Sequence, residues 1–487
     1  SNDEVLWLVD GIELGDPSAI TTAFQAEHLV SADISRVEVL RGNQSSLYGA
    51  DAIGGVINVI TARAHEDGLH VNAEAEGGSY GTASGGASIL GKSGAIDFRL
   101  TGTGFRDSGP SSADPATATP PGSIHEDDGY WRYGVSGRIG VAASDTLSFA
   151  ATGFWMDSRL DLDDTTSDSA DFVRKQEWAV GAQGKYQSRD DRLKIDLVAS
   201  RYEARRRYFG QYYASQGDLH DGTRDRVSLG LSYGGTGPVT IAAGGDYEHE
   251  TSLAVTSYSG RARETASTRS GYAELALRPL AGLTATGAGR YDDNSRFGAF
   301  WTWRATLAYV TGPVKFRASY GTGAKAPGLY QLFDPTYGNK ALRPEKSRGG
   351  DAGIDLAFTQ GLTGEITYFW NRKRDEINFD PTLAPYGRYQ TYGRTRARGV
   401  EVALIARPSP WLTLSQSYTY TDHTVDNAAP GTPDTGFVDS GRPKYSATTS
   451  VTLTPTPRAA LTVRIRYRDG DASGYGGATR PYTVADL

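Results

Sequence analysis

Apolar and polar residues alternate with a period of two from about residue 68 to the end of this 487-residue chain. Residues 461–468, which read LTVRIRYR, and residues 412–421 alternate strictly, and residues 96–101 and 193–197 repeat the pattern. A period of two gives a β-strand one apolar and one polar face, whereas an amphipathic helix needs a period of about 3.6. The pattern therefore excludes a helical or α/β fold for most of the chain.

The lengths of the strands and of their connections separate two kinds of all-β fold. The predicted strands run about 10–15 residues, and about ten residues tilted at 45° cross a bilayer, whereas strands of globular proteins average about 5–6. We count about 19 complete strands and the start of a twentieth, with tight turns after the even-numbered strands. Several connections after odd-numbered strands are long: 108–128, 160–172, 210–222, 326–345 and 424–441. Because alternate connections of an up-and-down barrel lie at opposite ends, this sorting predicts an antiparallel outer-membrane β-barrel rather than a soluble sandwich.

The composition agrees with a membrane barrel. The apolar face of each strand would meet lipid and the polar face would line a wet lumen, which explains a mean hydropathy of -0.44. The absence of cysteine excludes disulfides and thiolate metal sites. The net charge of -7 argues against a nucleic-acid partner. Aromatic residues near strand ends are expected at the membrane interfaces: Tyr130, Trp131, Trp155, Trp178, Tyr202, Trp301, Trp303, Trp370 and Trp411.

Residues 1–65 differ from the rest of the chain. Short β-branched runs at 5–9, 37–40 and 56–60 are punctuated by glycines, and a short helix is expected near residues 26–30. We therefore expect a small α+β unit at 1–65 and a barrel at 66–487. We expect no signal peptide within these residues, and we expect residues 482–487 to be the first half of a strand that is cut.

Ordered motifs in both parts resemble one family. Residues 34–42 read ISRVEVLRG and residues 46–61 read SLYGADAIGGVINVIT, which resembles the C-terminal half of the plug domain of TonB-dependent outer-membrane receptors. Residues 338–347 and 398–401 are similar to barrel motifs of the same family. The resemblance implies a plug inside a 22-stranded barrel. It also implies that the first half of the plug, with the TonB box, and the last strands of the barrel lie outside this chain.

The resemblance implies active import of a scarce ligand across the outer membrane of a Gram-negative bacterium. The expected partners are TonB with its inner-membrane energising complex, the bilayer and lipopolysaccharide, and the protein is expected to be a monomer. Residues 290–298 and 318–327 are most similar to segments of the vitamin B12 (cobalamin) receptors, so cobalamin or a related corrinoid is the first expectation. A ferric siderophore or haem is the alternative within the family. A passive porin or adhesin is the alternative outside it, but a porin lacks the plug motif.

No Ser, His and Asp set at catalytic spacing stands out, so we expect neither an enzyme nor a required cofactor. A barrel enzyme would need a clustered acid and base at its rim. For haem, His125 and His220 lie in predicted external loops, but no flanking motif supports them as axial ligands.

Arg41 follows a predicted strand of the plug and is expected to face the barrel wall. The resemblance pairs the arginine of this Leu-Arg-Gly motif with two barrel carboxylates that match Glu345 and Glu401. A buried guanidinium needs an acceptor, and two carboxylates in a lumen of low dielectric constant need a cation. We expect these residues to lock the plug to the wall and to loosen during transport. The alternative is that each of them is hydrated separately.

Aspartates crowd the predicted loop after the fifth barrel strand: Asp157, Asp161, Asp163, Asp164, Asp168 and Asp171. Carboxylates at this density repel one another unless they are hydrated or share a hard cation, and Ca²⁺ takes about 6–8 oxygen ligands. Cobalamin receptors order calcium in the equivalent loops, and Asp218 and Asp221 of the next long loop would contribute here. The sequence leaves a calcium site and a solvated acidic loop both open.

Ligand contacts are expected from the apical loop of the plug at residues 14–24 and from the long external loops. The candidates in the apical loop are Pro17, Ser18, Thr21 and Thr22. Tyr208, Phe209, Tyr212 and Tyr213 form an aromatic group that would pack against a large flat ligand. The alternative is that these rings pack only against their own loop.

Overall fold

The structure is a computed structural model that describes residues 4–22, 24, 34–110, 127–164, 167–426, 443–470 and 480–487, without the side chains of 164, 167 and 168. The short helix expected near 26–30 lies outside these residues. Among the described residues, no helix has the length and apolarity needed to cross a membrane.

The N-terminal part forms a four-stranded sheet in the order β2-β1-β4-β3. Its elements are β1 (Val5–Val9), β2 (Ile12–Leu14), β3 (Ile34–Arg41), α1 (Ser45–Tyr48) and β4 (Gly55–Thr61). β1 pairs with β4 in parallel, and the other two pairs are antiparallel. Gly55 is required where β4 meets β3, because a Cβ there would lie 2.5 Å from the Leu40 carbonyl oxygen. We call this unit the plug.

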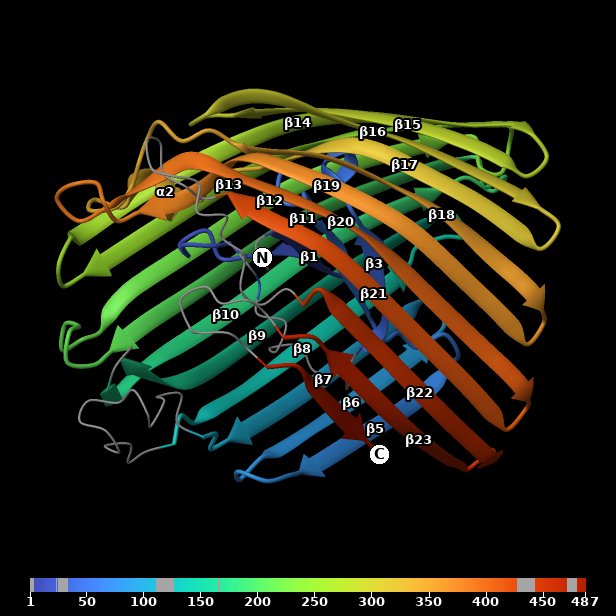
Figure 1. The fold of residues 1–487 in the computed structure, drawn as a ribbon, viewed down its shortest axis with the longest axis horizontal. Helices are drawn as coiled ribbons and strands as arrows, with labels where there is room; N and C mark the ends of the chain where they lie inside the picture. The colour runs from blue at the N-terminus through green and yellow to red at the C-terminus, as the bar shows by residue number, and fades with distance from the viewer. Residues whose placement is uncertain are drawn as a thin grey trace.

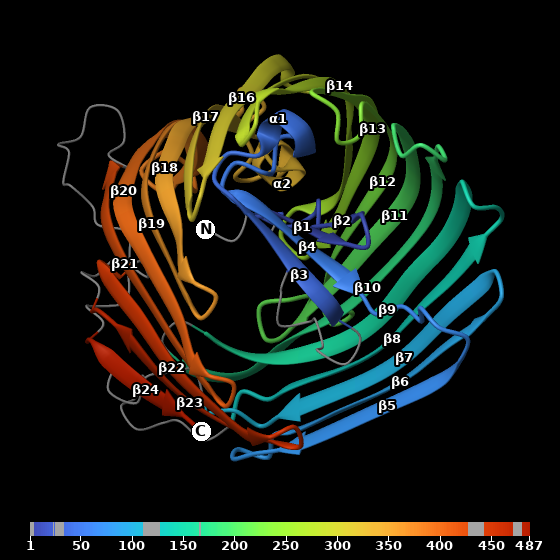
Figure 2. The same ribbon diagram turned by 90° about the vertical axis from the view of Figure 1, so that its right-hand side faces the viewer.

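The rest of the chain forms a closed barrel of consecutive antiparallel strands, β5 to β24, around the plug (Figure 1, Figure 2). The first ten strands are β5 (Gly68–Gly77), β6 (Ala83–Ser93), β7 (Ile96–Asp107), β8 (Tyr130–Ala142), β9 (Leu147–Asp164), β10 (Ser167–Gln187), β11 (Leu193–Phe209), β12 (Asp218–Tyr233), β13 (Val239–Thr256) and β14 (Gly260–Leu280). The others are β15 (Leu283–Asn294), β16 (Gly298–Thr311), β17 (Val314–Lys325), β18 (Glu345–Thr359), β19 (Leu362–Asp380), β20 (Arg388–Ser409), β21 (Leu412–Asp426), β22 (Tyr445–Thr456), β23 (Ala459–Arg468) and β24 (Tyr482–Asp486).

The tight turns lie where the sequence predicted them, but some predicted long loops are continuations of strands. β9 extends to Asp164 and β10 begins at Ser167, so the loop expected at 160–172 is mainly a hairpin. The prediction was wrong there because strand pairing continues beyond the thickness of a bilayer, and β10 has 21 residues. The loop expected at 326–345 contains a helix, α2 (Leu329–Phe333). We call the end of the barrel that carries α2 the mouth.

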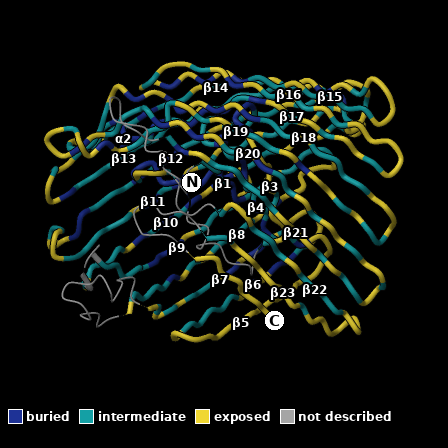
Figure 3. Tube along the Cα trace, viewed as in Figure 1, coloured by how far each residue is buried: buried dark blue, intermediate teal, exposed yellow. Residues whose placement is uncertain are grey.

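More and less exposed residues alternate along many of the barrel strands (Figure 3), as expected when successive side chains point to the lumen and to the outside. The plug packs most closely against β10, β11 and β14–β17, and its side chains also reach β12, β18, β19 and β20 (Figure 2). The main apolar core joins Ile12, Leu14 and Val59 of the plug to Tyr202 and Ala204 of β11. This position corrects the prediction for Tyr202. It does not lie at the membrane interface but is buried in the lumen, where its hydroxyl donates to Glu177.

Candidate functional site

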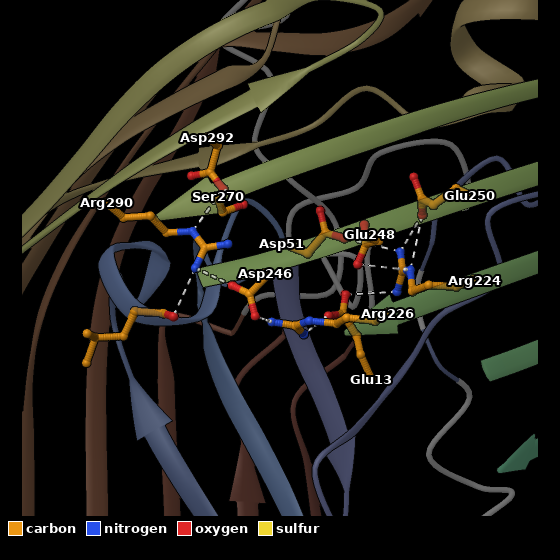
Figure 4. A network of polar contacts seen from close by, with 11 residues as sticks. Glu13, Asp51, Arg224, Arg226, Asp246, Glu248, Glu250, Ser270, Arg290 and Asp292 are labelled. Atoms are coloured by element: carbon orange, nitrogen blue, oxygen red, sulfur yellow. Dashed lines mark hydrogen bonds and ion pairs between the residues drawn. The ribbon is translucent and has the colours of Figure 1, made fainter. Parts of the chain in front are cut away.

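A carboxylate of the plug lies between two arginines of the barrel wall. Glu13 is in β2, and Arg224 and Arg226 point into the lumen from alternate positions of β12 (Figure 4). Arg224 Nη1 donates to Glu13 Oε1 at 2.9 Å, and Arg226 donates to Glu13 Oε2. All three side chains are at most 15% exposed. A buried carboxylate between two guanidinium groups therefore ties the plug to the wall.

The same contacts continue across the wall from β12 to β13 and on to β15, which is separated from β13 by β14. Arg226 Nη2 lies 2.9 Å from Asp246 of β13, whose other oxygen lies 2.8 Å from Arg290 Nη1 of β15. Arg290 also pairs with Asp292 at 2.8 Å and donates to the Leu47 carbonyl oxygen of α1 at 3.3 Å. Arg290 thus joins this chain of ion pairs to a second point on the plug.

Carboxylates outnumber guanidinium groups in this network. Its acidic members are Glu13, Asp51, Asp246, Glu248, Glu250 and Asp292, and its basic members are Arg224, Arg226 and Arg290 (Figure 4). The plug, the wall and α2 enclose a polar cavity of about 60 Å³ among them. An excess of buried acid favours the binding of protons.

Asp51 is the plug residue where this excess has its clearest effect. Loss of contact with water raises the pKa of its carboxyl group to about 7. Repulsion from Glu13 and Glu250 adds to the rise, and attraction to Arg224, whose Nη2 lies 3.6 Å away, opposes it. Asp51 therefore changes charge near neutral pH at the contact between plug and wall.

Hydrogen bonds that involve no carboxylate fix the plug at a neighbouring part of the wall. Asn43 donates to the Gly321 carbonyl oxygen at 3.1 Å and accepts from the Ser347 hydroxyl at 2.8 Å. Arg304 donates to the Asn43 carbonyl oxygen at 2.9 Å. The segment that leads into α1 is held by β16, β17 and β18 in this way.

The structure brings together two of the three residues expected to form the lock. Arg41 makes an ion pair with Glu401, although 74% of the Arg41 side chain is exposed. Glu345 instead lies 3.6 Å from Lys325 and accepts from the Ile377 backbone N–H at 3.0 Å. The role of the three residues as a lock stays a prediction, and the larger buried contact is the one made by Glu13.

The apical loop of the plug meets the wall close to the mouth. Asp16 Oδ2 accepts from Arg206 Nε of β11 at 2.7 Å, and its Oδ1 accepts from the Ser18 hydroxyl at 2.6 Å. Pro17 and Ser18 are buried, Thr22 is partly buried, and Thr21 is exposed. The exposed residues in the described part of this loop are Ile20 and Thr21.

A row of aromatic rings lies at the mouth and spans three parts of the wall. The Tyr208 ring of β11 lies 5.8 Å from that of His220 in β12, which lies 6.5 Å from Tyr330 of α2. Tyr330 lies 6.3 Å from Tyr389 of β20, and Tyr389 lies 5.5 Å from Phe379 of β19. All five rings are within aromatic contact distance, so the row presents several π-faces and edges to one ligand.

Only part of the predicted aromatic group belongs to this row. The Tyr213 ring lies 5.8 Å from Tyr208, whereas the Tyr212 side chain is 68% exposed. Phe209 stacks on Phe172 at 4.7 Å on the outer face of the wall. Tyr208 and Phe209 are neighbours in the sequence, but successive side chains of β11 point to opposite faces of the wall. Tyr208 therefore faces the lumen, whereas Phe209 faces outward. His125, the other histidine considered for haem, lies outside the described residues.

The aspartates considered for calcium take other partners. Asp157 is held by Arg174 at 2.6 Å, and Asp161 lies 2.8 Å from Arg159. Asp163 accepts from the Ser169 backbone and Asp171 from the Gln211 backbone.

Asp218 and Asp221 lie in β12 rather than in the predicted loop. Asp218 accepts from the Ser257 backbone, and Asp221 pairs with Arg205 at 2.8 Å. The side chains of Asp164 and Asp168 lie outside those described. In the described part of the chain, no three His, Asp or Glu side chains form a group able to hold a metal ion. A calcium site stays a prediction that needs a direct titration.

Sequence reasoning missed the network around Glu13, although a signal was present. Charged residues occupy alternate positions 224 and 226 of one predicted strand and 246, 248 and 250 of the next. The register sets Arg224 opposite Glu250 and Arg226 opposite Glu248. Opposite charges at a period of two on neighbouring strands indicate a shared lumen face.

Comparison with known proteins gives matches over nearly the whole chain. Residues 89–487 match the family model described as TonB dependent receptor-like, beta-barrel. Residues 1–56 match the model described as TonB-dependent Receptor Plug Domain.

Solved structures of the same fold include siderophore receptors. The receptor PirA from Acinetobacter baumannii superposes with a TM-score of 0.79 at 15% identity, over 99% of this chain and 83% of that one. PirA from Pseudomonas aeruginosa gives 0.77 at 18% identity, over 100% and 84%. A variant of the ferric enterobactin receptor PfeA from Pseudomonas aeruginosa, in complex with enterobactin, gives 0.80 at 15% identity, over 100% and 83%.

Proposed function

We propose, from the premise that the chain belongs to the TonB-dependent receptor family, that it imports a ferric siderophore. Members of this family are transporters of the Gram-negative outer membrane rather than enzymes, and they work with TonB. Membership of the family does not specify the ligand, so the choice of a ferric siderophore is the part of this proposal that goes beyond it.

The row of rings at the mouth carries this proposal. Tyr208, His220, Tyr330 and Tyr389 offer aromatic faces and edges above the plug. One positive group lies beside these rings: Arg206 donates to the Tyr208 hydroxyl at 2.9 Å and also pairs with Asp16 of the plug. Many siderophores bind iron through phenolate or carbonyl oxygens and carry negative charge. A binding site that combines aromatic rings with cations is therefore suited to such ligands.

Two cations at α2 add to this description. Arg296 lies 4.8 Å and Lys340 lies 5.6 Å from the centre of the Phe333 ring. Cations held over rings at a wet surface keep their charge available to an anionic ligand.

The siderophore receptors among the similar structures support the same ligand class. At identities of 15–18%, these similarities show the fold alone. They support the ligand class only in combination with the geometry of the mouth. Cobalamin, the first expectation from the sequence, has no such support. For haem, His220 is packed between the rings of Tyr208 and Tyr330.

Binding to the purified full-length protein tests the ligand class. The protein in detergent is titrated with ferric enterobactin, cyanocobalamin and haemin, and tryptophan quenching is followed. We expect saturable binding of the ferric siderophore, weakened about threefold to tenfold by Tyr330→Ala through loss of one ring contact. Tyr309→Ala, a ring on the outer wall, is the matched control and should leave binding unchanged. Saturable binding of cyanocobalamin or haemin alone would refute the ligand class.

The finer features of the family belong to this proposal as well. We propose that residues 1–65 act as the plug and 66–487 as the barrel, in a full protein of 22 strands that works as a monomer. TonB would pull on a TonB box in the N-terminal half of the plug, and the contacts of Glu13 with the wall would have to open for the ligand to pass. Ca²⁺ is not needed for this mechanism.

A further inference from the structure

Seven basic residues face outward from three adjacent strands of the barrel. The lumen face of these strands is fixed by contacts with the plug: Lys373 reaches Glu4, Ser347 reaches Asn43, and Glu401 reaches Arg41. Residues at the alternate positions therefore point away from the lumen. Those that are basic are Lys346, Arg348, Arg372, Arg374, Arg394, Arg396 and Arg398, and all of them are exposed.

The strand register places these cations directly beside one another. Arg348 of β18 lies opposite Arg372 of β19, which lies opposite Arg396 of β20. Like charges in directly opposed cross-strand positions destabilise a sheet unless an anion lies between them. Within the described residues, no carboxylate lies within ion-pair distance of these three guanidinium groups.

A second row lies closer to the mouth and repeats the arrangement. Lys346 lies opposite Arg374, which lies opposite Arg394. Asp375 lies 3.9 Å from Arg374, and Asp426 lies opposite Arg394 in β21. Two adjacent rows therefore carry a large excess of positive charge on one patch of the outer wall.

Several outward arginines of the opposite wall pair with acids. On β10–β12, Arg174 pairs with Asp157 at 2.6 Å and Arg205 pairs with Asp221 at 2.8 Å. Arg201 likewise pairs with Asp225 at 3.1 Å. A row of arginines also occurs on that wall, because Arg174 lies opposite both Arg159 and Arg207. There Arg159 pairs with Asp161 and Arg174 with Asp157, so what sets β18–β20 apart is a row of described arginines without such acids.

An apolar surface begins directly below the two rows. Along β19, the outward residues on the side away from the mouth are Trp370, Tyr368 and Ile366, and Tyr368 and Ile366 are about half exposed. A groove of about 780 Å³ is lined by Arg348, Arg372 and Arg396 together with Tyr368 and Trp370. Arg398 and Asp422 also line it, and these two side chains pair with each other at 2.8 Å. Aromatic residues followed by cations mark the level where acyl chains give way to headgroups.

We propose that these two rows bind the phosphate groups of a phosphorylated glycolipid in the outer leaflet. Guanidinium groups bind phosphate by two parallel hydrogen bonds, and the register places three arginines on neighbouring strands whose backbones lie about 5 Å apart. Acyl chains of the same molecule would lie along Tyr368 and Ile366. The continuous apolar surface below the cations selects a lipid headgroup over a free phosphate ion.

Titration of the full-length protein in detergent tests this site. The probes are bisphosphorylated lipid A, its dephosphorylated form, and inorganic phosphate, and bound lipid is counted by native mass spectrometry. The test variant is R348Q/R372Q/R396Q, and R174Q/R201Q/R205Q removes the same number of charges from the opposite wall. A triple lysine variant at 348, 372 and 396 keeps the charge.

Each outcome bears on the proposal. Since each cation near a membrane surface contributes roughly a fivefold factor, the glutamine variant should bind lipid A about 100-fold more weakly. The opposite-wall control should change less than about threefold, and the lysine variant should lose less than about tenfold. Equal losses in the two glutamine variants, or equal losses in the lysine and glutamine variants, would overturn the site. Equal binding of dephosphorylated lipid A, or competition by inorganic phosphate at equal concentration, would overturn the ligand.

Discussion

Substitution of Glu13 by Gln tests the electrostatic attachment of the plug to the wall. Glutamine keeps the shape and one acceptor oxygen, but it removes the charge that bridges Arg224 and Arg226. Its amide NH₂ group would point at a guanidinium group, with which it makes no hydrogen bond. The change therefore removes one charge-assisted bond and weakens the other.

The magnitude depends on the partners that remain. A hydrogen bond to a charged group contributes about 1.5–3 kcal/mol and a neutral one about 0.5–1.5. Arg224 keeps Glu250 at 2.7 Å and Arg226 keeps Asp246 at 2.9 Å, so neither arginine loses all its partners. Loss of Glu13 also relieves its repulsion of Asp51. We expect the plug to be destabilised by about 2 kcal/mol, less than the 3–5 kcal/mol of a broken isolated buried pair.

Hydrogen exchange measures this effect directly, because the opening free energy of β1 and β2 reports the detachment of the plug. A double-mutant cycle with Arg226→Gln should give a coupling energy of about 1.5 kcal/mol between Glu13 and Arg226. Glu38→Gln is the matched control in the same unit, since Glu38 pairs with Arg36 at 2.8 Å on an exposed face. It should change the opening free energy by less than about 0.5 kcal/mol. A coupling energy near zero, or an equal effect of the control, would refute the reasoning.

Three further predictions concern single groups. The raised pKa of Asp51 means that ionisation of its carboxyl group opposes folding. The contribution of this group to the stability of the protein is therefore greatest below about pH 4 and is lost as the pH rises to 7. Asp51→Asn should remove that fall and be more stable at pH 8 by at most about 4 kcal/mol, measured by denaturation at both pH values. Arg41→Ala should reduce ligand uptake while changing plug stability by less than about 1 kcal/mol, since its pair with Glu401 is half exposed. Calorimetric titration with Ca²⁺ should show saturable heat if the acidic hairpin binds the ion, and Asp161→Asn with Asp163→Asn should abolish that heat.

Local periodicity predicted the barrel well, because alternation and turn position are properties of short segments. The length of a strand beyond the bilayer was less predictable. Residues 160–172 are polar and acidic, as in a loop, yet β9 and β10 pair through most of them. Hydrogen bonding between neighbouring strands, rather than residue type, decides where such a hairpin ends.

The candidate site was predictable only in part, since it depends on segments far apart in the chain. The motif with Arg41 placed it beside Glu401, but Glu345 has a lysine of its own wall beside it. The attachment through Glu13 depends on which strands the plug faces, and nothing local to Glu13 states that. Tyr202 shows the same limit, because alternation does not reveal which face of a strand is the lumen.

Uptake of iron by cells tests the central claim most directly. A strain without other iron-siderophore receptors is supplied with the full-length protein and with ferric enterobactin labelled with radioactive iron. We expect accumulation that requires both this protein and TonB, and that falls to background when either is removed. Accumulation that persists without TonB, or none above background when both are present, would contradict the account.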